Sequence, residues 1–266
     1  MPLRILSAFA LALIAFNAVP AEISADALRE LAPSGKLRVA INYGNPVLAS
    51  KERGGRMHGL AVDIARELGR QSGVPVELVG YERAAEVVAN VKQNAWDVGF
   101  VSVPVARTAE IIVTAPYMDV EVTYLVPERS RFRSVREVDN PGVRIVVQEN
   151  YSTDFFLSTR LMHAVLFRAA DNATALRMLK SDAAEAFASS KHRLVLLAQS
   201  NPGYRVLDDR FATISHAIGV PAGRNAAAAY VSQFAEDMKA SGFLKRAVEQ
   251  AGVQGVVIAP AAQGSR

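Results

Sequence analysis

The sequence contains no cysteine in its 266 residues. A disulfide framework, a thiolate metal site and a cysteine nucleophile are therefore excluded, and so is lipid attachment at a cysteine after the hydrophobic N-terminal segment. The sequence has only four histidines, His58, His163, His192 and His216. Their spacing is not that of metal ligands, so we expect neither a metal site nor another cofactor.

The chain also lacks a strong excess of charge, with 30 Lys and Arg against 26 Asp and Glu. Its densest basic segment, residues 129–136, is interrupted by a phenylalanine and flanked by glutamates. A nucleic-acid interface would need a longer basic stripe and a recognisable motif behind it. We therefore expect no nucleic-acid partner and interpret this segment as a solvated loop.

Long hydrophobic runs are scarce as well. The main one is Ile5–Phe16, preceded by Arg4 and followed by Val19-Pro20-Ala21, which offers small residues for cleavage. The run is shorter than the ~20 residues of a membrane-spanning helix, and a polar segment follows it. The pattern favours a signal peptide over residues 1–21, cleaved near Ala21, and hence a periplasmic protein; a membrane anchor is the alternative.

Half of the residues are hydrophobic and 21% are charged, which is typical of a globular protein with a sizeable core. After the leader, strand-like and helix-like segments alternate. We predict strands over 36–42, 74–79 and 97–101 and helices over 59–69 and 84–93. This βαβαβ order predicts a parallel sheet that is covered by helices.

A second alternation follows an extended run at 120–127. We predict strands over 143–148, 165–167, 185–188 and 204–207 and helices over 153–159, 173–180 and 191–199. Another extended run, 216–221, then precedes two more helices, 225–240 and 243–252. The two extended runs indicate a chain that leaves one lobe, builds a second and returns to the first. Two such crossings form a hinge, and its closure would bury whatever lies between the lobes.

The predicted boundaries are a signal peptide at 1–21, a discontinuous first lobe at 22–119 and 217–266, and a second lobe at 120–216. The hinge crossings are expected near 119–125 and 212–217.

The segment Asp97–Tyr117 carries the strongest indication of a binding site. Its apolar run, Val98–Val101, leads to Ser102 and then to a lone Arg107. A guanidinium at the carboxyl end of a strand, beside a hydroxyl and free amides, is suited to bidentate binding of a carboxylate. Ligands of open α/β sheets bind at that edge. The alternative is a surface arginine paired with Glu110.

With these features in place, the chain resembles the periplasmic solute-binding proteins of polar amino-acid ABC transporters, the bacterial extracellular family 3. The stretches that carry the resemblance are Leu37–Ile41, Gly59–Gly69, Trp96–Tyr117 and Ser241–Pro260. It implies a two-lobed α/β fold of the type II periplasmic binding proteins, with two parallel or mixed sheets, flanking helices and a two-stranded hinge. It also implies a monomer that binds a small carboxylate-bearing ligand and delivers it to an ABC permease in the inner membrane.

By the same resemblance, Ser102 and Arg107 bind the ligand carboxylate. Other positions depart from the family pattern. Ser190 stands where members that bind α-amino acids usually carry an acid for the ligand ammonium, and Asn45 and Ala84 stand where an aromatic pair is common. The pocket could hold a carboxylate without an ammonium group, or Glu149 could serve as the replacement anion.

The turn Asn150–Thr153 opens a predicted helix, with Ser152 or Thr153 as its N-cap, and the amides of such a turn favour an anion. Asn42 ends the first strand at the edge that faces the cleft. The residues that we expect to contact the ligand are Arg107, Ser102, Asn42, Asn45, Val101, Glu149, Asn150, Tyr151, Ser152 and Ser190.

Two other functions stay open. The same fold includes periplasmic cyclohexadienyl dehydratases, and in such an enzyme Glu149 would have to be the proton-transferring acid. The chain could also be a ligand-sensing protein or an accessory protein of a periplasmic oxidoreductase. We expect a binding protein rather than an enzyme, because the sequence contains no evident pair of catalytic groups.

Overall fold

The computed structural model describes residues 23–104, 106 and 109–262. The helices are α1 (Ala25–Leu31), α2 (Leu60–Ser72), α3 (Ala84–Ala89), α4 (Ser152–Ser158), α5 (Asn172–Lys180), α6 (Lys191–Ser200), α7 (Asn225–Ala240) and α8 (Phe243–Ala251), with one 3-10 turn at Val135–Glu137. The strands are β1 (Leu37–Asn42), β2 (Ser50–Lys51), β3 (Met57–His58), β4 (Val76–Tyr81), β5 (Val98–Ser102), β6 (Ile111–Val113), β7 (Met118–Pro127), β8 (Arg144–Gln148), β9 (Val165–Ala169), β10 (Ala186–Ser190), β11 (Tyr204–Val206), β12 (Ala212–Pro221) and β13 (Val256–Ile258).

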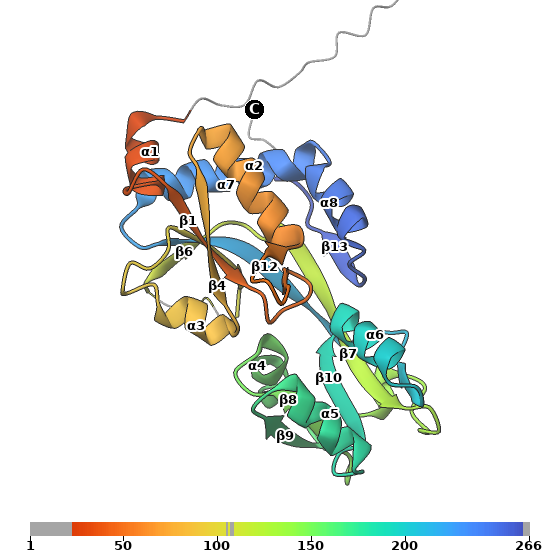
Figure 1. The fold of residues 1–266 in the computed structure, drawn as a ribbon. Coiled ribbons are helices and arrows are strands. Elements are labelled where there is room, and N and C mark those ends of the chain that lie inside the picture. The colour runs from red at the N-terminus through yellow and green to blue at the C-terminus, as the bar shows by residue number, and fades with distance from the viewer. Residues whose placement is uncertain (1–22, 105, 107–108, 263–266) are drawn as a thin grey trace, which may run out of the picture.

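The elements form two lobes, which Figure 1 shows one above the other. In lobe one, β1 pairs in parallel with β4 on one side and β5 on the other. Helix α2 packs its apolar face on this sheet because Leu60, Ile64 and Leu68 recur at helical spacing and are fully or almost fully buried. A smaller cluster around Trp96 covers the opposite face. The predicted βαβαβ unit is therefore present.

Lobe two repeats this arrangement. Strand β8 pairs in parallel with β9 on one side and β10 on the other. As with β1 in lobe one, the central strand of the three is the first of them in the chain. One apolar cluster lies on each face of the sheet: one contains Tyr124 and Ile145, and the other contains Leu125 and Phe187. Each lobe thus has its own core, which agrees with the two-lobed α/β class predicted from sequence.

The lobes are joined by β7 and β12, which run from one lobe to the other in Figure 1. They pair antiparallel from Ala212↔Val122 to His216↔Met118. Beyond this stretch β12 pairs with β5 and β7 pairs with β10. The two predicted sheets are therefore hydrogen-bonded into one continuous set of strands. A third strand, β13, pairs with the other edge of β7, so the connection is broader than the predicted two-stranded hinge.

Several elements differ from the sequence-based prediction. Helix α1, the β2–β3 hairpin and strands β6 and β13 were not anticipated, since they are short and lack a clear period. Helix α3 ends at Ala89 rather than at residue 93, because Asn90 caps it with both its backbone and side-chain amides bonded to the Glu86 carbonyl. Strand β12 begins four residues before the predicted run at 216–221.

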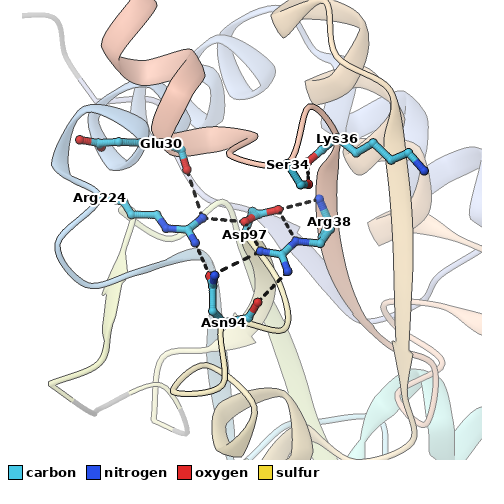
Figure 2. A network of polar contacts seen from close by, with 7 residues as sticks. All are labelled: Glu30, Ser34, Lys36, Arg38, Asn94, Asp97 and Arg224. Carbon is cyan, nitrogen blue, oxygen red and sulfur yellow. Dashed lines mark hydrogen bonds and ion pairs between the residues drawn. The ribbon is translucent and has the colours of Figure 1, made fainter.

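A buried polar network fixes the amino ends of β1 and β5. Asp97 is fully buried and accepts hydrogen bonds from the backbone amide of Arg38 at 3.0 Å, from its Nε at 2.9 Å and from its Nη2 at 2.7 Å. Arg224 donates to the same carboxylate at 2.6 Å, and Figure 2 shows both guanidinium groups converging on it. The network also includes Asn94 and the carbonyl of Glu30. It sets the register of these strands, whose opposite ends carry Asn42 and Ser102.

Candidate functional site

A cavity lies between the lobes, at the carboxyl ends of four parallel strands. Lobe one contributes the residues that end or follow β1 and β5, and lobe two contributes those that end or follow β8 and β10. Backbone amides and helix starts gather at such strand ends, where α/β proteins bind their ligands. The hinge strands β7 and β12 add Val120, Val122, Ile214 and His216 to the wall, and α3 adds Ala84 and Val87.

From lobe one, Asn42, Asn45 and Ser102 line the cavity. Asn42 is 3% exposed, and its Oδ1 atom has no hydrogen-bond partner among the described residues. Asn45 uses its Oδ1 to accept from the amide of Val47 at 3.1 Å, which fixes the turn after β1. Asn42 therefore lines the cavity with its Oδ1 acceptor unused, whereas the side-chain oxygen of Asn45 is already used by the fold.

From lobe two, Tyr151, Ser152 and Ser190 line the cavity. The Ser152 hydroxyl lies 2.6 Å from the Ser102 hydroxyl, so the two lobes are in direct contact across the cavity. Burial raises the pKa of the Tyr151 hydroxyl, and the nearby charge of Arg193 and side-chain hydrogen bonds with Asn42 and Gln148 offset part of that rise. The Tyr151 hydroxyl is therefore protonated at neutral pH, and it interacts with Asn42 of lobe one and Gln148 of lobe two.

The N-cap of α4 differs from the prediction. Tyr151 is the N-cap residue, and its side chain makes no capping hydrogen bond. Ser152 and Thr153 are the first two residues of the helix instead. The hydroxyl of Ser152 is consequently not used in capping and is available to Ser102.

Arg193 is a charged cavity residue that the sequence analysis did not indicate. It is the third residue of α6, which follows β10 directly with Ser190 as its N-cap. Its Nη2 donates to the carbonyl of Gly44 in lobe one. Burial lowers the pKa of the guanidinium, but an arginine keeps its proton in proteins. Arg193 is half-buried and forms no ion pair with any described residue, so its charge is available to an anion.

His216 lies on β12 beside the cavity and is 5% exposed. Its Nδ1 lies 3.1 Å from the carbonyl oxygen of Ile214, and it therefore donates to that carbonyl as the protonated nitrogen. Burial lowers the pKa of His216 to about 4, and the hydrogen bond and the charge of Asp119 offset only part of this effect. The imidazole is neutral at pH 7.

The structure brings seven of the predicted residues together and leaves two out, Glu149 and Asn150. The residues of the predicted set that line the cavity are Asn42, Asn45, Val101, Ser102, Tyr151, Ser152 and Ser190. Glu149 and Asn150 do not line it: both are exposed and face a neighbouring depression beside Arg83 and Glu86. They turn outward because the sharp turn after β8 has Asn150 at a φ of 61°. Arg107 lies outside the described residues.

The described part of the chain contains no group of three or more His, Asp or Glu side chains arranged to hold a metal ion. No helix within it is long and apolar enough to cross a membrane. The predicted signal peptide, residues 1–21, also lies outside the described residues.

Solved structures with the same fold are numerous. An amino acid ABC transporter substrate-binding protein from Streptococcus pneumoniae bound to L-arginine has a TM-score of 0.69 and 19% identity, covering 83% of this chain and 96% of that one. A solute receptor for L-cysteine of Neisseria gonorrhoeae has a TM-score of 0.70 and 22% identity, covering 84% and 92%. An ancestral amino acid-binding protein, a precursor of cyclohexadienyl dehydratase, has a TM-score of 0.68 and 21% identity, covering 84% and 98%.

At these identities the likeness establishes the fold, and it confirms the predicted type II periplasmic binding protein architecture. Comparison with curated proteins found no match. Residues 37–253 match the family of bacterial extracellular solute-binding proteins, family 3. The match covers more than half of the chain and confirms the resemblance drawn from the sequence motifs. The chain therefore belongs to the bacterial extracellular solute-binding proteins, family 3.

Proposed function

We propose that the protein is an exported receptor that captures a small carboxylate-bearing molecule between its lobes and delivers it to an ABC permease. The observation that carries this proposal is Arg193, a guanidinium without an ion-pair partner among the described residues, placed at the interlobe cavity. A half-buried cation of this kind has lost part of its hydration, so an anion that pairs with it in the cavity would be stabilising. A carboxylate can accept two parallel charge-assisted hydrogen bonds from one guanidinium.

The hydroxyls of Ser102 and Ser152 support the same proposal. They meet across the cavity at 2.6 Å, one from each lobe, and could turn together toward a ligand oxygen. A ligand that accepts from both serines would interact with both lobes and would favour the arrangement in which they touch. Ligand binding and lobe closure would then be coupled, which is what a transport receptor requires. Arg107 remains a predicted second cation of this site.

Binding is favoured over catalysis because the proposed dehydratase acid is absent from the cavity wall. Glu149 is exposed and faces the neighbouring depression, so it is not placed to transfer a proton to a molecule held in the cavity. His216 lines the cavity, but its low pKa makes it a weak base near neutral pH. We infer that release of the unchanged ligand, rather than its conversion, ends each cycle.

The test compares Arg193→Ala and Arg193→Lys with the wild type by isothermal titration calorimetry against a panel of small carboxylates. We expect Arg193→Ala to weaken binding at least 30-fold, because losing one partner of a buried hydrogen-bonded charge pair costs about 2 kcal/mol or more. The lysine variant should lie between the two, since it keeps the charge but loses the bidentate fork. Binding that is unchanged in Arg193→Ala would contradict the proposed site.

A further inference from the structure

We propose that the cavity selects carboxylates that carry a neutral hydroxyl or amide group and rejects those that carry an ammonium group, so that its ligand is an organic acid rather than an α-amino acid. This inference rests on the proposed function, namely carboxylate capture at Arg193, and narrows the class of ligand. It follows from the charges and the unpaired polar atoms around the cavity.

The described cavity wall carries one charged side chain at neutral pH, which is Arg193. None of its described residues is an aspartate or a glutamate, and His216 is neutral. The undescribed positions that follow β5 are Val105, Arg107 and Thr108, so none of them supplies an acid either. One carboxylate would balance the charge of Arg193, and an added ammonium group would restore a buried positive charge without a partner.

Three acidic residues lie near the cavity without lining it. Asp119, whose charge acts on His216, accepts a hydrogen bond from the Ser215 hydroxyl at 2.6 Å and is therefore already paired within the fold. Glu149 faces the neighbouring depression, as described above. Glu82 affects the pKa of Tyr151 as a minor cause, but its side chain is exposed and it does not line the cavity. An exposed carboxylate in water interacts weakly with a charge inside a cleft because solvent screens the pair. Neither glutamate therefore offsets the positive charge of an ammonium group inside the cavity.

The polar atoms of the wall fit a neutral donor instead. Asn42 Oδ1 is buried and has no hydrogen-bond partner among the described residues, and it needs an N–H or O–H group. Ser189 and Ser190 add hydroxyls from the end of β10. A hydroxyl or amide of the ligand satisfies such atoms without bringing in a charge. A carboxylate with a neighbouring hydroxyl, as in a 2-hydroxy acid, meets both requirements.

The test uses matched pairs in which a hydroxyl replaces the ammonium group: L-lactate and L-alanine, L-malate and L-aspartate, phenyllactate and phenylalanine. Calorimetry is done at pH 7.5 on the chain without residues 1–21. In every pair that binds, the hydroxy acid should bind at least tenfold more tightly than the amino acid. An amino acid that binds as tightly as its hydroxyl partner would overturn this inference and leave carboxylate capture intact. If no acid of the panel binds, the proposed function itself is wrong, and the inference falls with it.

A pair of variants at Ser190 tests the charge argument directly. Ser190 is the N-cap residue of α6, and Asp and Asn are both favourable N-cap residues of nearly the same size, so the two variants differ mainly in one charge. We expect Ser190→Asp to bind the hydroxyl member at least tenfold more weakly than Ser190→Asn, because the new carboxylate repels the ligand and competes for Arg193. Equal affinities of the two variants would show that cavity charge does not set the selectivity and would overturn the inference.

Discussion

Acidification should destabilise this protein, and a defined part of that loss should come from His216. In the folded chain its pKa is about 4, whereas an exposed histidine has a pKa near 6.5. Because the folded value is the lower one, the unfolded chain binds the proton more readily. The stability that His216 contributes is therefore fully present above pH 6.5 and is lost progressively as the pH falls toward 4.

The size of the effect follows from the two pKa values. At pH 5 the imidazole is protonated in nearly all unfolded molecules and in few folded ones. The free energy of unfolding should therefore fall by about 2 kcal/mol between pH 7 and pH 5 on account of His216 alone. Asp119 lies close enough to raise the pKa of His216 slightly, and this effect is already contained in the value of about 4.

Urea unfolding at pH 7 and pH 5 measures this loss. The His216→Gln variant stays neutral at both values, so its loss of stability should be about 2 kcal/mol smaller than that of the wild type. His58, whose side chain is 57% exposed, provides the control, and His58→Gln should keep the wild-type pH dependence. Burial also lowers the pKa of His192, and this contribution cancels because it is present in every variant. Identical pH dependence in His216→Gln and wild type would refute the reasoning.

Two further predictions concern the scaffold around the site. Asp97→Ala should cost about 3–5 kcal/mol in urea unfolding, because it leaves two partly buried arginines without their shared carboxylate. Asp26→Ala removes an exposed ion pair with Arg29 and should cost about 1 kcal/mol or less, so similar losses in the two variants would contradict the assigned role of the network. Gly44→Ala should weaken ligand binding and lower the melting temperature, because its Cβ would lie 1.8 Å from the carbonyl oxygen of Glu82. A Cβ at Gly54 would have no atom within 4 Å, so Gly54→Ala should leave both properties nearly unchanged, and equal effects of the two substitutions would count against this account.

Long periodic segments made most of the fold predictable from sequence. The predicted helix over 225–240 is α7, and the predicted helices over 173–180 and 191–199 differ from α5 and α6 by one residue at one end. Such helices form because one apolar face is buried, and the helical spacing of the apolar residues on that face is visible in the sequence. Strand β13 was missed because its three residues owe their conformation to pairing with β7, far away in the chain.

The candidate site was predictable where a strand ends in a polar residue. Asn42, Ser102 and Ser190 each close a buried strand, and all three line the cavity. Glu149, which follows β8 directly, was expected as a replacement anion for the acid that the family pattern places at Ser190. A turn with a positive φ at Asn150 separates it from the cavity, and a backbone reversal of this kind is not encoded in hydrophobic periodicity.

The cavity lies at the carboxyl ends of parallel strands in both lobes, the edge where α/β proteins bind ligands, although the sequence motifs direct attention mainly to lobe one. In lobe one it leads to the segment after β5 and to Arg107, which stays a prediction. In lobe two the equivalent segment follows β10, where Ser190 starts α6 and Arg193 occupies its third position. A residue at that position of a helix that begins at the sheet edge points back toward its own N-terminus and hence toward the cleft. The argument that selects Arg107 after β5 therefore also selects Arg193 after β10. If both arginines contacted a ligand carboxylate, one from each lobe, their attraction to it would favour the closed arrangement of the lobes.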